Sequence, residues 1–544
     1  MADLALSPDH AAPASEQDQA AADAPGQPTH EVGFRKWLIT ITVITCAIME
    51  LIDTSIVNVA TRQIAGNLGA TIDETAWVIT AYAVSNIIVI PLTGFLSDLI
   101  GRKVYFSASV ALFTGASFLC GFSGSIETLI FWRFVQGIGG GALLATAQTV
   151  LVETFPPEEL DKANGIFGAG IVMGPTLGPL LGGYLTDNFH WGWIFYINVP
   201  IGILATFLAW KYIKGTKKPL AGRIDYLGIL FMAVGIGGLQ IVLEEGERKD
   251  WFASPFIVVL AVAALVGLAL FILRELKTEN PVVDLRILKN KNVAIGSALR
   301  FAFGVAIFAS VFLYPVFVQG FLGWNATRTG LLILPGAFVT GMLMGVSGAL
   351  LKKGANPKIL VIFGFGFVIA YEILAFYLAT PEAGEWDFLW PQIIRGVGFG
   401  LIFVPVASLS LTGLQGKDVA QASGLTNMLQ LLGGSIGIAV VNTFVARRIA
   451  DHRVELLPNI NLSNPATADR YQAMLQAFQG MGHSLNEAQR MAMGVLEGTV
   501  STQAAILGYR EGFMLIGLVC MVTIPLVLFA RFKKGDAVAV GGAH

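Results

Sequence analysis

The chain has 544 residues, of which 54% are hydrophobic and 13% are charged, and its formal net charge is −2. With a mean hydropathy of +0.67, this composition is typical of a polytopic membrane protein and excludes an ordinary soluble domain. The near-neutral charge gives no indication of nucleic-acid binding, because no basic cluster with interleaved aromatic residues accompanies it.

Fourteen apolar segments near the length needed to cross a bilayer follow one another along the chain, joined mostly by short polar turns. They predict an all-α membrane protein with fourteen transmembrane helices. In chain order the expected spans are Trp37–Val59, Thr75–Leu96, Val104–Phe122, Glu127–Val150, Ala163–Leu185, Trp193–Ile213, Asp225–Leu243, Phe252–Leu273, Val293–Val318, Thr329–Leu350, Lys358–Ala379, Phe388–Thr412, Ala420–Val445 and Tyr509–Ala530.

Basic residues gather in every second loop and at the ends of the chain, whereas the alternate loops are acidic or neutral. By the positive-inside rule this pattern predicts that both termini are cytoplasmic and that the number of spans is even. The basic residues concerned are Arg35, Lys36, Arg102, Lys103, Lys214, Lys217, Lys218, Arg223, Lys277, Arg286, Lys289, Lys291, Lys352, Lys353 and Lys533.

The chain divides into five segments on these grounds. Residues 1–34 lack any apolar run and are predicted to be a disordered cytoplasmic tail and not a signal peptide. Residues 35–213 form an N-terminal group of six spans, residues 214–292 carry two additional spans with cytoplasmic linkers, and residues 293–531 form a C-terminal group of six. Within the last group, residues 447–505 are expected to be a periplasmic loop with helix-compatible runs, able to dock a partner or to cap the exit. Residues 532–544 are a second cytoplasmic tail.

Two acidic residues lie inside the first span, where Glu50 and Asp53 are three residues apart and so share one helical face. An ionisable side chain at that depth costs about 2.5–3.5 kcal/mol on insertion scales, so it normally faces a partner or a watery path. The alternative is that a neighbouring helix holds the carboxylate only for assembly. We expect a proton-carrying role, with Asp53 as the primary carrier and Glu50 as the second candidate.

The same stretch resembles the first-helix motif of the EmrB/QacA-type family of fourteen-span drug:proton antiporters in the major facilitator superfamily. The matching residues are Asp53, Thr54, Ile56, Val57, Asn58, Val59 and Ala60. Thr61 and Arg62 depart from the Leu-Pro pair usual in that family. The resemblance implies a fold of two six-helix halves plus two extra central helices.

The segment GFLSDLIGRK joins the second and third spans. It resembles the cytoplasmic gate motif of the superfamily. Gly94 is expected to permit close helix contact, Asp98 to accept from helix-end amides, and Gly101 to supply a tight turn. Arg102 and Lys103 then anchor the turn on the inner side. A degenerate second copy at residues 348–358 indicates two homologous halves.

The fourth span carries Arg133, followed by Gln136 and Gly137. Arg133 and Asp53 each lie about six residues from the outer end of their spans, or about 9 Å at 1.5 Å per residue, so they are at matching depth. The family resemblance assigns Arg133 and Gln136 a part in proton transfer. In the second half, Glu372 and Arg395 reach a comparable depth and form a second candidate pair on weaker evidence.

The fifth span contains glycines at every fourth position, which form a ridge without side chains along one helical face. A single pair of glycines four residues apart would be explained by a tightly packed membrane helix alone. The longer pattern resembles the family's antiporter motif, from which Pro179 departs as an additional proline. The motif residues are Gly170, Gly174, Pro175, Gly178, Gly182 and Gly183.

The substrate cavity is expected to involve an aromatic ninth span, although an aromatic stripe is also typical of core packing. The candidate residues are Asn58, Phe308, Phe312, Tyr314 and Gln319. Gly192 and Gln430 stand where this family usually has arginine, which indicates a shifted substrate range.

Catalysis, metal binding and nucleotide-driven pumping find no support in the sequence. All six histidines lie outside the spans, the three cysteines lie at unrelated places within spans, and no GxxxxGK[ST] loop is present. We therefore expect no enzyme activity, no metal and no cofactor other than the proton-motive force.

The combined expectation is a proton-coupled secondary active exporter of amphipathic or hydrophobic organic compounds, such as drugs, in a bacterial cytoplasmic membrane. An exporter of one specific metabolite or siderophore on the same fold, or a passive facilitator, is the alternative. The family resemblance further implies a periplasmic adaptor protein and an outer-membrane channel as partners.

Overall fold

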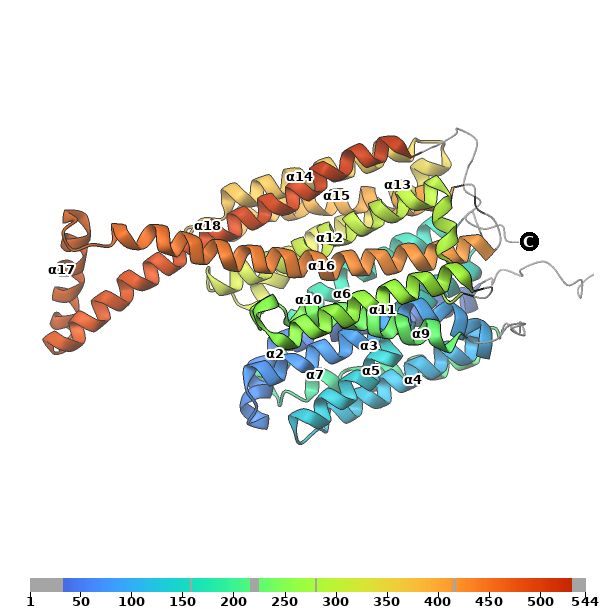
Figure 1. Cartoon of the computed structure of the whole chain (residues 1–544), viewed down its shortest axis with the longest axis horizontal. Coiled ribbons are helices and arrows are strands. Elements are labelled where there is room, and N and C mark those ends of the chain that lie inside the picture. The colour runs from blue at the N-terminus through green and yellow to red at the C-terminus, as the bar shows by residue number, and fades with distance from the viewer. Residues whose placement is uncertain are drawn as a thin grey trace, which may run out of the picture.

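The structure, a computed structural model, describes residues 33–530 apart from 157–158, 216–224, 279–280, 413 and 415–416. The predicted tails at 1–34 and 532–544 fall almost entirely outside the described residues, as does part of the expected linker after residue 214. Within the described part the chain is helical, and the helices form one elongated bundle (Figure 1).

The predicted all-α, fourteen-helix architecture is confirmed. Thirteen helices of the described residues are long and apolar enough to cross a membrane, and α6, with 29 residues, packs between α2 and α13 as the fourteenth. The first half consists of α2 (Phe34–Leu68), α3 (Ile72–Ile100), α4 (Arg102–Gly121), α5 (Ile126–Thr154), α6 (Leu160–Asn188), α7 (Trp193–Tyr196) and α8 (Asn198–Tyr212).

The second half follows an inserted helical hairpin. The hairpin comprises α9 (Tyr226–Met232), η1 (Ala233–Gly237), α10 (Gly238–Glu245), η2 (Trp251–Ala253) and α11 (Pro255–Lys277). After η3 (Leu285–Lys289), the second half comprises α12 (Lys291–Gly320), α13 (Ala326–Lys352), α14 (Pro357–Leu378), α15 (Glu385–Leu411), α16 (Lys417–Leu456), η4 (Leu457–Asn459), α17 (Pro465–Gly480) and α18 (Leu485–Phe529).

Helix boundaries follow from local chemistry. A capping box of Thr71 and Glu74 begins α3, and its side-chain oxygens satisfy amides that have no partner within the helix. Gly69 ends α2 with φ 63°, and Gly101 makes the turn from α3 to α4 with φ 87°. Both conformations favour glycine, so the expected tight turn at Gly101 is present.

The inserted hairpin lies against both halves. Its helices α10 and η1 contact α3 of the first half, and α10 also contacts α16 of the second. At its outer turn Glu245 accepts a hydrogen bond of 3.0 Å from Thr80 on α3, while Trp251 donates one of 3.1 Å to Thr443 on α16. The hairpin therefore bridges the two halves along one side of the bundle.

The expected loop at 447–505 is largely helical. The last turns of α16 and the first turns of α18 run together beyond the rest of the bundle and carry α17 at their tip (Figure 1). Ion pairs join the two helices near the base of this arm, between Arg448 and Glu511 and between Arg453 and Glu497. The arm is thus a braced helical projection.

The opposite end of the bundle, which carries the α3–α4 turn, is called the inner end here. At this end Asn427 on α16 lies 3.5 Å from Gln148 on α5, which places a polar contact across the two halves. A Cβ on Gly168 of α6 would collide with Met344 of α13. The two halves are consequently packed together at the inner end.

Candidate functional site

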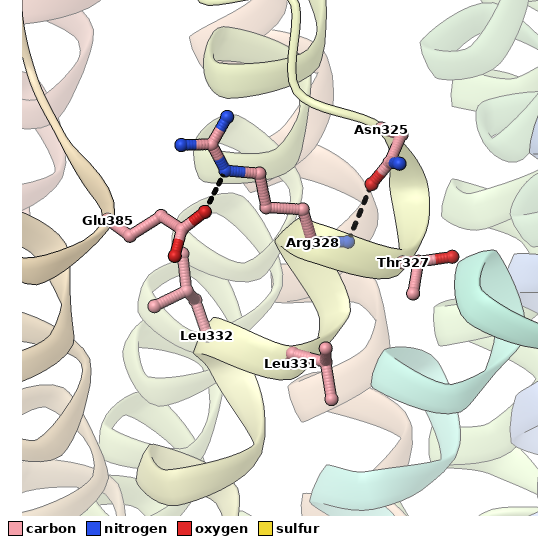
Figure 2. A pocket seen from close by; sticks show the side chains of 6 residues that line it. All are labelled: Asn325, Thr327, Arg328, Leu331, Leu332 and Glu385. Atoms are coloured by element: carbon pink, nitrogen blue, oxygen red, sulfur yellow. Dashed lines mark hydrogen bonds and ion pairs between the residues drawn. The ribbon is translucent and has the colours of Figure 1, made fainter.

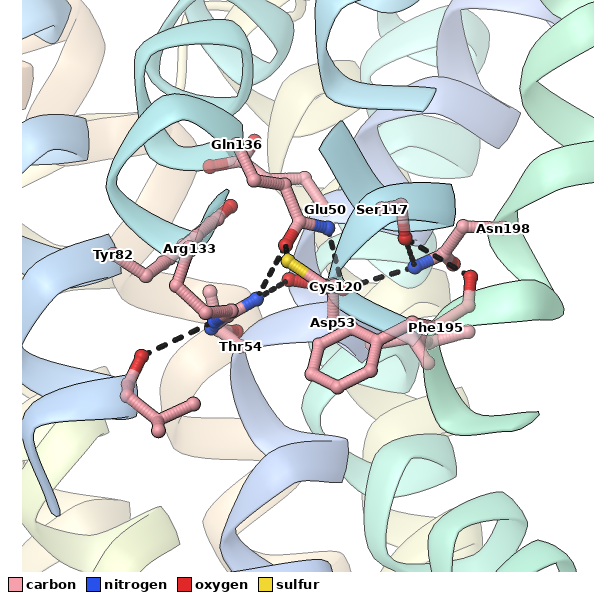
Figure 3. A network of polar contacts seen from close by, with 12 residues as sticks. Glu50, Asp53, Thr54, Tyr82, Ser117, Cys120, Arg133, Gln136, Phe195 and Asn198 are labelled. Carbon is pink, nitrogen blue, oxygen red and sulfur yellow. Dashed lines mark hydrogen bonds and ion pairs between the residues drawn. The ribbon is translucent and has the colours of Figure 1, made fainter. Parts of the chain in front are cut away.

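A buried charge pair lies in the first half, between α2 and α5. Arg133 donates from Nη1 to Oδ2 of Asp53 at 2.5 Å, and the two side chains are 1% and 0% exposed. The helix-depth count placed these residues at the same height, and the structure brings them into contact (Figure 3).

Gln136 completes a triangle with this pair. Its Nε2 donates to Oδ1 of Asp53 at 2.9 Å, and its Oε1 accepts from Arg133 at 2.8 Å. Arg133 and Gln136 are three residues apart on α5 and so project from one face of the helix. The residues assigned by the motif therefore act as a single hydrogen-bonded unit.

Two further contacts hold the Arg133 side chain. Its Nε donates to the carbonyl of Val78 at 3.2 Å, and its guanidinium carbon lies 4.2 Å from the centroid of the Tyr82 ring. Both partners belong to α3. A cation over an aromatic face is attracted by the ring quadrupole, so α3 fixes the position of the guanidinium relative to Asp53.

Asn198 is a member of this network that the sequence reasoning missed. Its Nδ2 donates to Oδ1 of Asp53 at 2.9 Å and lies 3.1 Å from Oγ of Ser117, which itself donates to the carbonyl of Phe195. Asn198 is the first residue of α8, just after the break that separates α7. A polar residue beside a helix break within an apolar span was the available signal.

Glu50, the second acid of α2, has a different environment. It is 5% exposed, and its Oε1 accepts from Asn86 of α3 at 3.0 Å. Its Oε2 is buried without a hydrogen-bond partner. Glu50 makes no direct hydrogen bond to Asp53 or Arg133 in the described structure. It is linked to them through α3, because Asn86 also donates to the hydroxyl of Tyr82 at 3.4 Å, and the Tyr82 ring faces Arg133.

The glycine ridge of α6 lies directly against another helix, as its spacing predicts, and the structure identifies that helix as α2. A Cβ on Gly174 would lie 2.5 Å from Cβ of Leu51, and a Cβ on Gly182 would lie 2.9 Å from Ile56. The ridge thus contacts α2 on both sides of Asp53 along the chain. Gly183 is buried, while the side chain of Pro175 lies outside the described residues.

The gate segment agrees in part with expectation. Arg102 forms an ion pair with Glu153 near the end of α5, and Lys103 places its ammonium 5.2 Å from the ring centroid of Trp210. Asp98 is exposed. The close helix contact expected at Gly94 is not present, because a Cβ there would meet open space.

The second candidate pair is arranged differently from the first. Glu372 on α14 is 0% exposed and neither of its carboxylate oxygens has a hydrogen-bond partner. Arg395 on α15 instead donates to the backbone carbonyl of Ser310 on α12 at 3.3 Å and lies 5.1 Å from the Tyr371 ring centroid. The two residues are neighbours but make no ion pair in the described structure.

The candidate cavity residues are dispersed. Asn58 is exposed, Gln319 and Phe312 are partly buried, and Phe308 packs where a Cβ on Gly434 would lie. Tyr314 is fully buried, with its ring 5.3 Å from that of Phe388. Tyr314 therefore belongs to the packed interior of the second half in this conformation.

A surface pocket lies between the outer ends of α13 and α15 (Figure 2). Arg328 and Glu385 form an ion pair across it, and Asn325 caps α13 by accepting from the amide of Arg328 at 2.8 Å. These contacts stabilise two helix ends. The pocket is far from the buried charge pair in sequence and belongs to different helices.

The Asp53 network is a closed polar unit inside an apolar bundle. The carboxylate accepts hydrogen bonds from a guanidinium and two amides, and its lack of exposure removes competition from water. The position of Arg133 therefore depends on the charge of a single carboxylate.

A two-halved helical bundle with charged side chains buried inside both halves has the architecture of a multi-pass membrane transporter. Comparison with solved structures supports this fold. A bacterial homologue of the human lysosomal transporter Spinster, in an inward-facing and unoccupied conformation, superimposes with a TM-score of 0.54 at 14% identity, covering 93% of this chain and 100% of that chain.

Sequence comparisons are more specific. The model of the Major Facilitator Superfamily matches residues 43–438. The multidrug export protein EmrB of Escherichia coli K12 is 35% identical over 93% of this chain and 98% of the relative. The fatty acid resistance protein FarB of Neisseria gonorrhoeae is 34% identical over 93% of this chain and 97% of its own length. The chain belongs to the Major Facilitator Superfamily, in its EmrB-type branch.

Proposed function

We propose that this protein is a proton-driven exporter of amphipathic or hydrophobic organic compounds, drugs among them, in a bacterial inner membrane. The observation that carries this proposal is the buried contact between Asp53 and Arg133, made with Gln136 and Asn198. The names of the EmrB and FarB relatives support export of drug-like or lipid-like compounds. No cofactor is needed beyond the proton-motive force.

The coupling step we propose is exchange of one proton at Asp53. In the ionised state the carboxylate holds Arg133, Gln136 and Asn198 together. When a proton arrives from outside, the ion pair loses its charge attraction and α5 and α8 are released from α2. Return of Arg133 to the carboxylate then drives the proton to the inside. Glu50, with one oxygen unpartnered, serves as the second candidate carrier.

The glycine ridge transmits this local change to the rest of the fold in our proposal. α6 contacts α2 on one side and α13 of the opposite half on the other. A shift of α2 relative to α5 therefore displaces the seam between the halves. The gate segment at Asp98, Arg102 and Lys103 holds the inner end in one of the two alternating states.

We propose that both termini are cytoplasmic, an orientation supported by the basic residues in every second loop. The arm formed by α16, α17 and α18 then projects into the periplasm. We propose that it is the part of the chain that meets a periplasmic adaptor, which in turn connects to an outer-membrane channel. A reporter fused after Lys353 should be cytoplasmic and one inserted near Asn464 periplasmic, and opposite labelling at either site would contradict this orientation.

The energy available is sufficient for concentrative export. One elementary charge moving inward across about 100 mV supplies about 2.3 kcal/mol, or roughly a 40-fold concentration ratio, before any pH gradient is added. Reconstituted vesicles with an imposed proton gradient should accumulate a panel of amphipathic dyes, and an uncoupler should abolish the accumulation. The Asp53→Asn variant should bind the dyes but not concentrate them.

This experiment also decides between the proposal and its alternatives. A passive facilitator would equilibrate the dyes at the same rate with and without the gradient. An exporter of one metabolite or siderophore would ignore most of the panel while still responding to the gradient. Proton-dependent accumulation by Asp53→Asn vesicles would move the carrier role to Glu50 or Glu372.

A further inference from the structure

Arg300 is a buried cation that the proton site does not use. It lies on α12 and is 3% exposed. Its Nη1 donates to Oε1 of Gln430 on α16 at 2.5 Å, and its guanidinium carbon lies 4.8 Å from the ring centroid of Phe403 on α15. Its Nε is buried without a partner. The guanidinium is therefore held by one neutral oxygen and one aromatic ring.

No acidic side chain balances this charge. Across the described ranges of the chain, no aspartate or glutamate forms an ion pair with Arg300, and the side chain that accepts its hydrogen bond is the neutral amide of Gln430. Arg133, by contrast, forms an ion pair with Asp53. A charge buried without a counter-ion is costly and is normally retained for function.

The immediate surroundings offer further unused donors and little negative charge. Ser297 precedes Arg300 by three residues, so the two occupy one face of α12, and its buried hydroxyl oxygen also has no partner. A guanidinium nitrogen and a hydroxyl without acceptors form a place where an anion would be stabilised.

Aromatic rings lie beside this polar group. The ring centroids of Phe303 and Phe403 are 6.1 Å apart, and those of Phe303 and Phe399 are 5.9 Å apart. One side of the site is thus cationic and the other is apolar. That combination suits a ligand that carries a negative group on a hydrophobic body.

The position of Arg300 and Gln430 near the contact between the two halves explains how such a ligand could enter. Gln430 is three residues from Asn427, which makes the polar contact with Gln148 of the opposite half. Arg300 is nine residues into α12, or about 14 Å from its inner end. Separation of the halves at the inner end would expose the Arg300–Gln430 contact to the side from which an exporter collects its substrate.

We propose that Arg300 and Gln430 form a substrate-binding subsite for the carboxylate of an amphipathic organic acid, occupied when the inner end is open. This inference rests on the proposed export function and names its substrate class. Arg300 supplies the guanidinium from α12, and Gln430 supplies the neighbouring amide from α16.

The test is equilibrium binding by the full-length protein in nanodiscs of zwitterionic lipid, with no proton gradient. The probes are dansyl-labelled undecanoic acid and its methyl ester, which differ in charge but share the apolar body. The wild type should prefer the acid. Arg300→Gln should weaken binding of the acid by about 10- to 100-fold, as expected for lost hydrogen bonds to a charged group, and should leave ester binding unchanged.

The double variant Arg300→Gln/Gln430→Arg returns a guanidinium from the opposite helix and should restore the preference for the acid. Unchanged binding of the acid by Arg300→Gln would overturn the proposal, and so would an equal loss of both probes, since that indicates a packing role. Displacement of the acid by anionic lipid added to the disc would assign the subsite to a headgroup and also overturn it.

Asp53→Asn is the control that separates this inference from the proposed function. Because binding is measured without a gradient, that variant should keep the preference for the acid even though it cannot concentrate substrate. Loss of acid preference in Arg300→Gln with normal proton-driven export of neutral dyes would support the subsite alone. Failure of proton coupling with the acid preference intact would contradict only the exporter mechanism.

Discussion

The two halves of the molecule each bury an acid and an arginine, but only one half pairs them. In the first half Asp53 receives three hydrogen bonds from Arg133, Gln136 and Asn198. In the second half Glu372 has none, and Arg395 bonds to a backbone carbonyl of α12. Related helical frameworks therefore carry a closed polar network on one side and an open one on the other.

The surroundings of Glu372 extend the contrast. Buried polar atoms without partners also occur on Ser310, Tyr314, Tyr371 and Gln392, from α12, α14 and α15. Protonation of Asp53 would weaken three hydrogen bonds at once, whereas protonation of Glu372 breaks no ion pair among the described residues. We therefore expect coupling to depend more on the first half.

The largest difference should appear in transport. Asp53→Asn removes the charge that holds Arg133, so the accumulation ratio in energised vesicles should fall to about one, the value without coupling. Glu372→Gln should keep most of the accumulation, because no ion pair in the described structure depends on its charge. Equal collapse of both variants would break the contrast between the halves.

The arginines should differ in stability. Arg133→Ala leaves the buried Asp53 carboxylate without its counter-charge, which costs about 3–5 kcal/mol. Arg395→Ala loses one hydrogen bond from a charged group to a carbonyl and the cation–π contact with Tyr371, which together are worth about 2–3 kcal/mol. Thermal unfolding of both purified variants in the same detergent measures the difference, and an equal fall in Tm would contradict it.

The glycine ridge gives a third comparison. Gly174→Leu places a side chain against Leu51 and should destabilise the α2–α6 contact by about 1–3 kcal/mol, with loss of export but not of membrane insertion. Gly366 on α14 has open space around it, so Gly366→Leu is the matched control and should be silent. Normal export by Gly174→Leu would show that close α2–α6 packing is unnecessary.

The smallest effects should come from the neutral amides. Asn198→Ala removes a bond to Asp53 and should cost about 1 kcal/mol. Gln392, buried without partners in the second half, can be replaced by leucine with little change or a slight gain, since its amide gains nothing from burial. Differential unfolding of the two variants tests this, and a larger loss in Gln392→Leu would indicate that the open network holds ordered water.

The sequence predicted how far along its helix each charged residue lies, but it did not predict the direction in which each side chain points around the helix axis. Counting residues put Asp53 level with Arg133 and Glu372 level with Arg395, yet only the first two side chains face each other. Rotation about a helix axis is set by packing against neighbours, and the glycine ridge indicated the packed face of α6 alone. Asn198 was missed because it is far from the motif residues in sequence and lies at a helix break.

The extent of the last helices was also beyond the sequence argument. Apolar runs near residues 420–445 and 509–530 marked the part inside lipid, whereas α16 and α18 continue as helices into the region expected to be a loop. Hydropathy identifies the apolar part of a helix, but it does not identify the residue at which the helix ends. The charged pairs at Arg448 and Arg453, which brace the arm, connect residues too distant in sequence for spacing to reveal them.

The continuity of α16 links the contact between the two halves to the arm. One unbroken helix of 40 residues begins near the polar contact at Asn427, passes the hairpin contact at Thr443, and leads to the tip that carries α17. If the second half rotates about the contact at Asn427, a rigid helix converts a small rotation into a larger displacement at its far end. A fluorophore on α17 should therefore report such a rotation as a change in distance from the bundle.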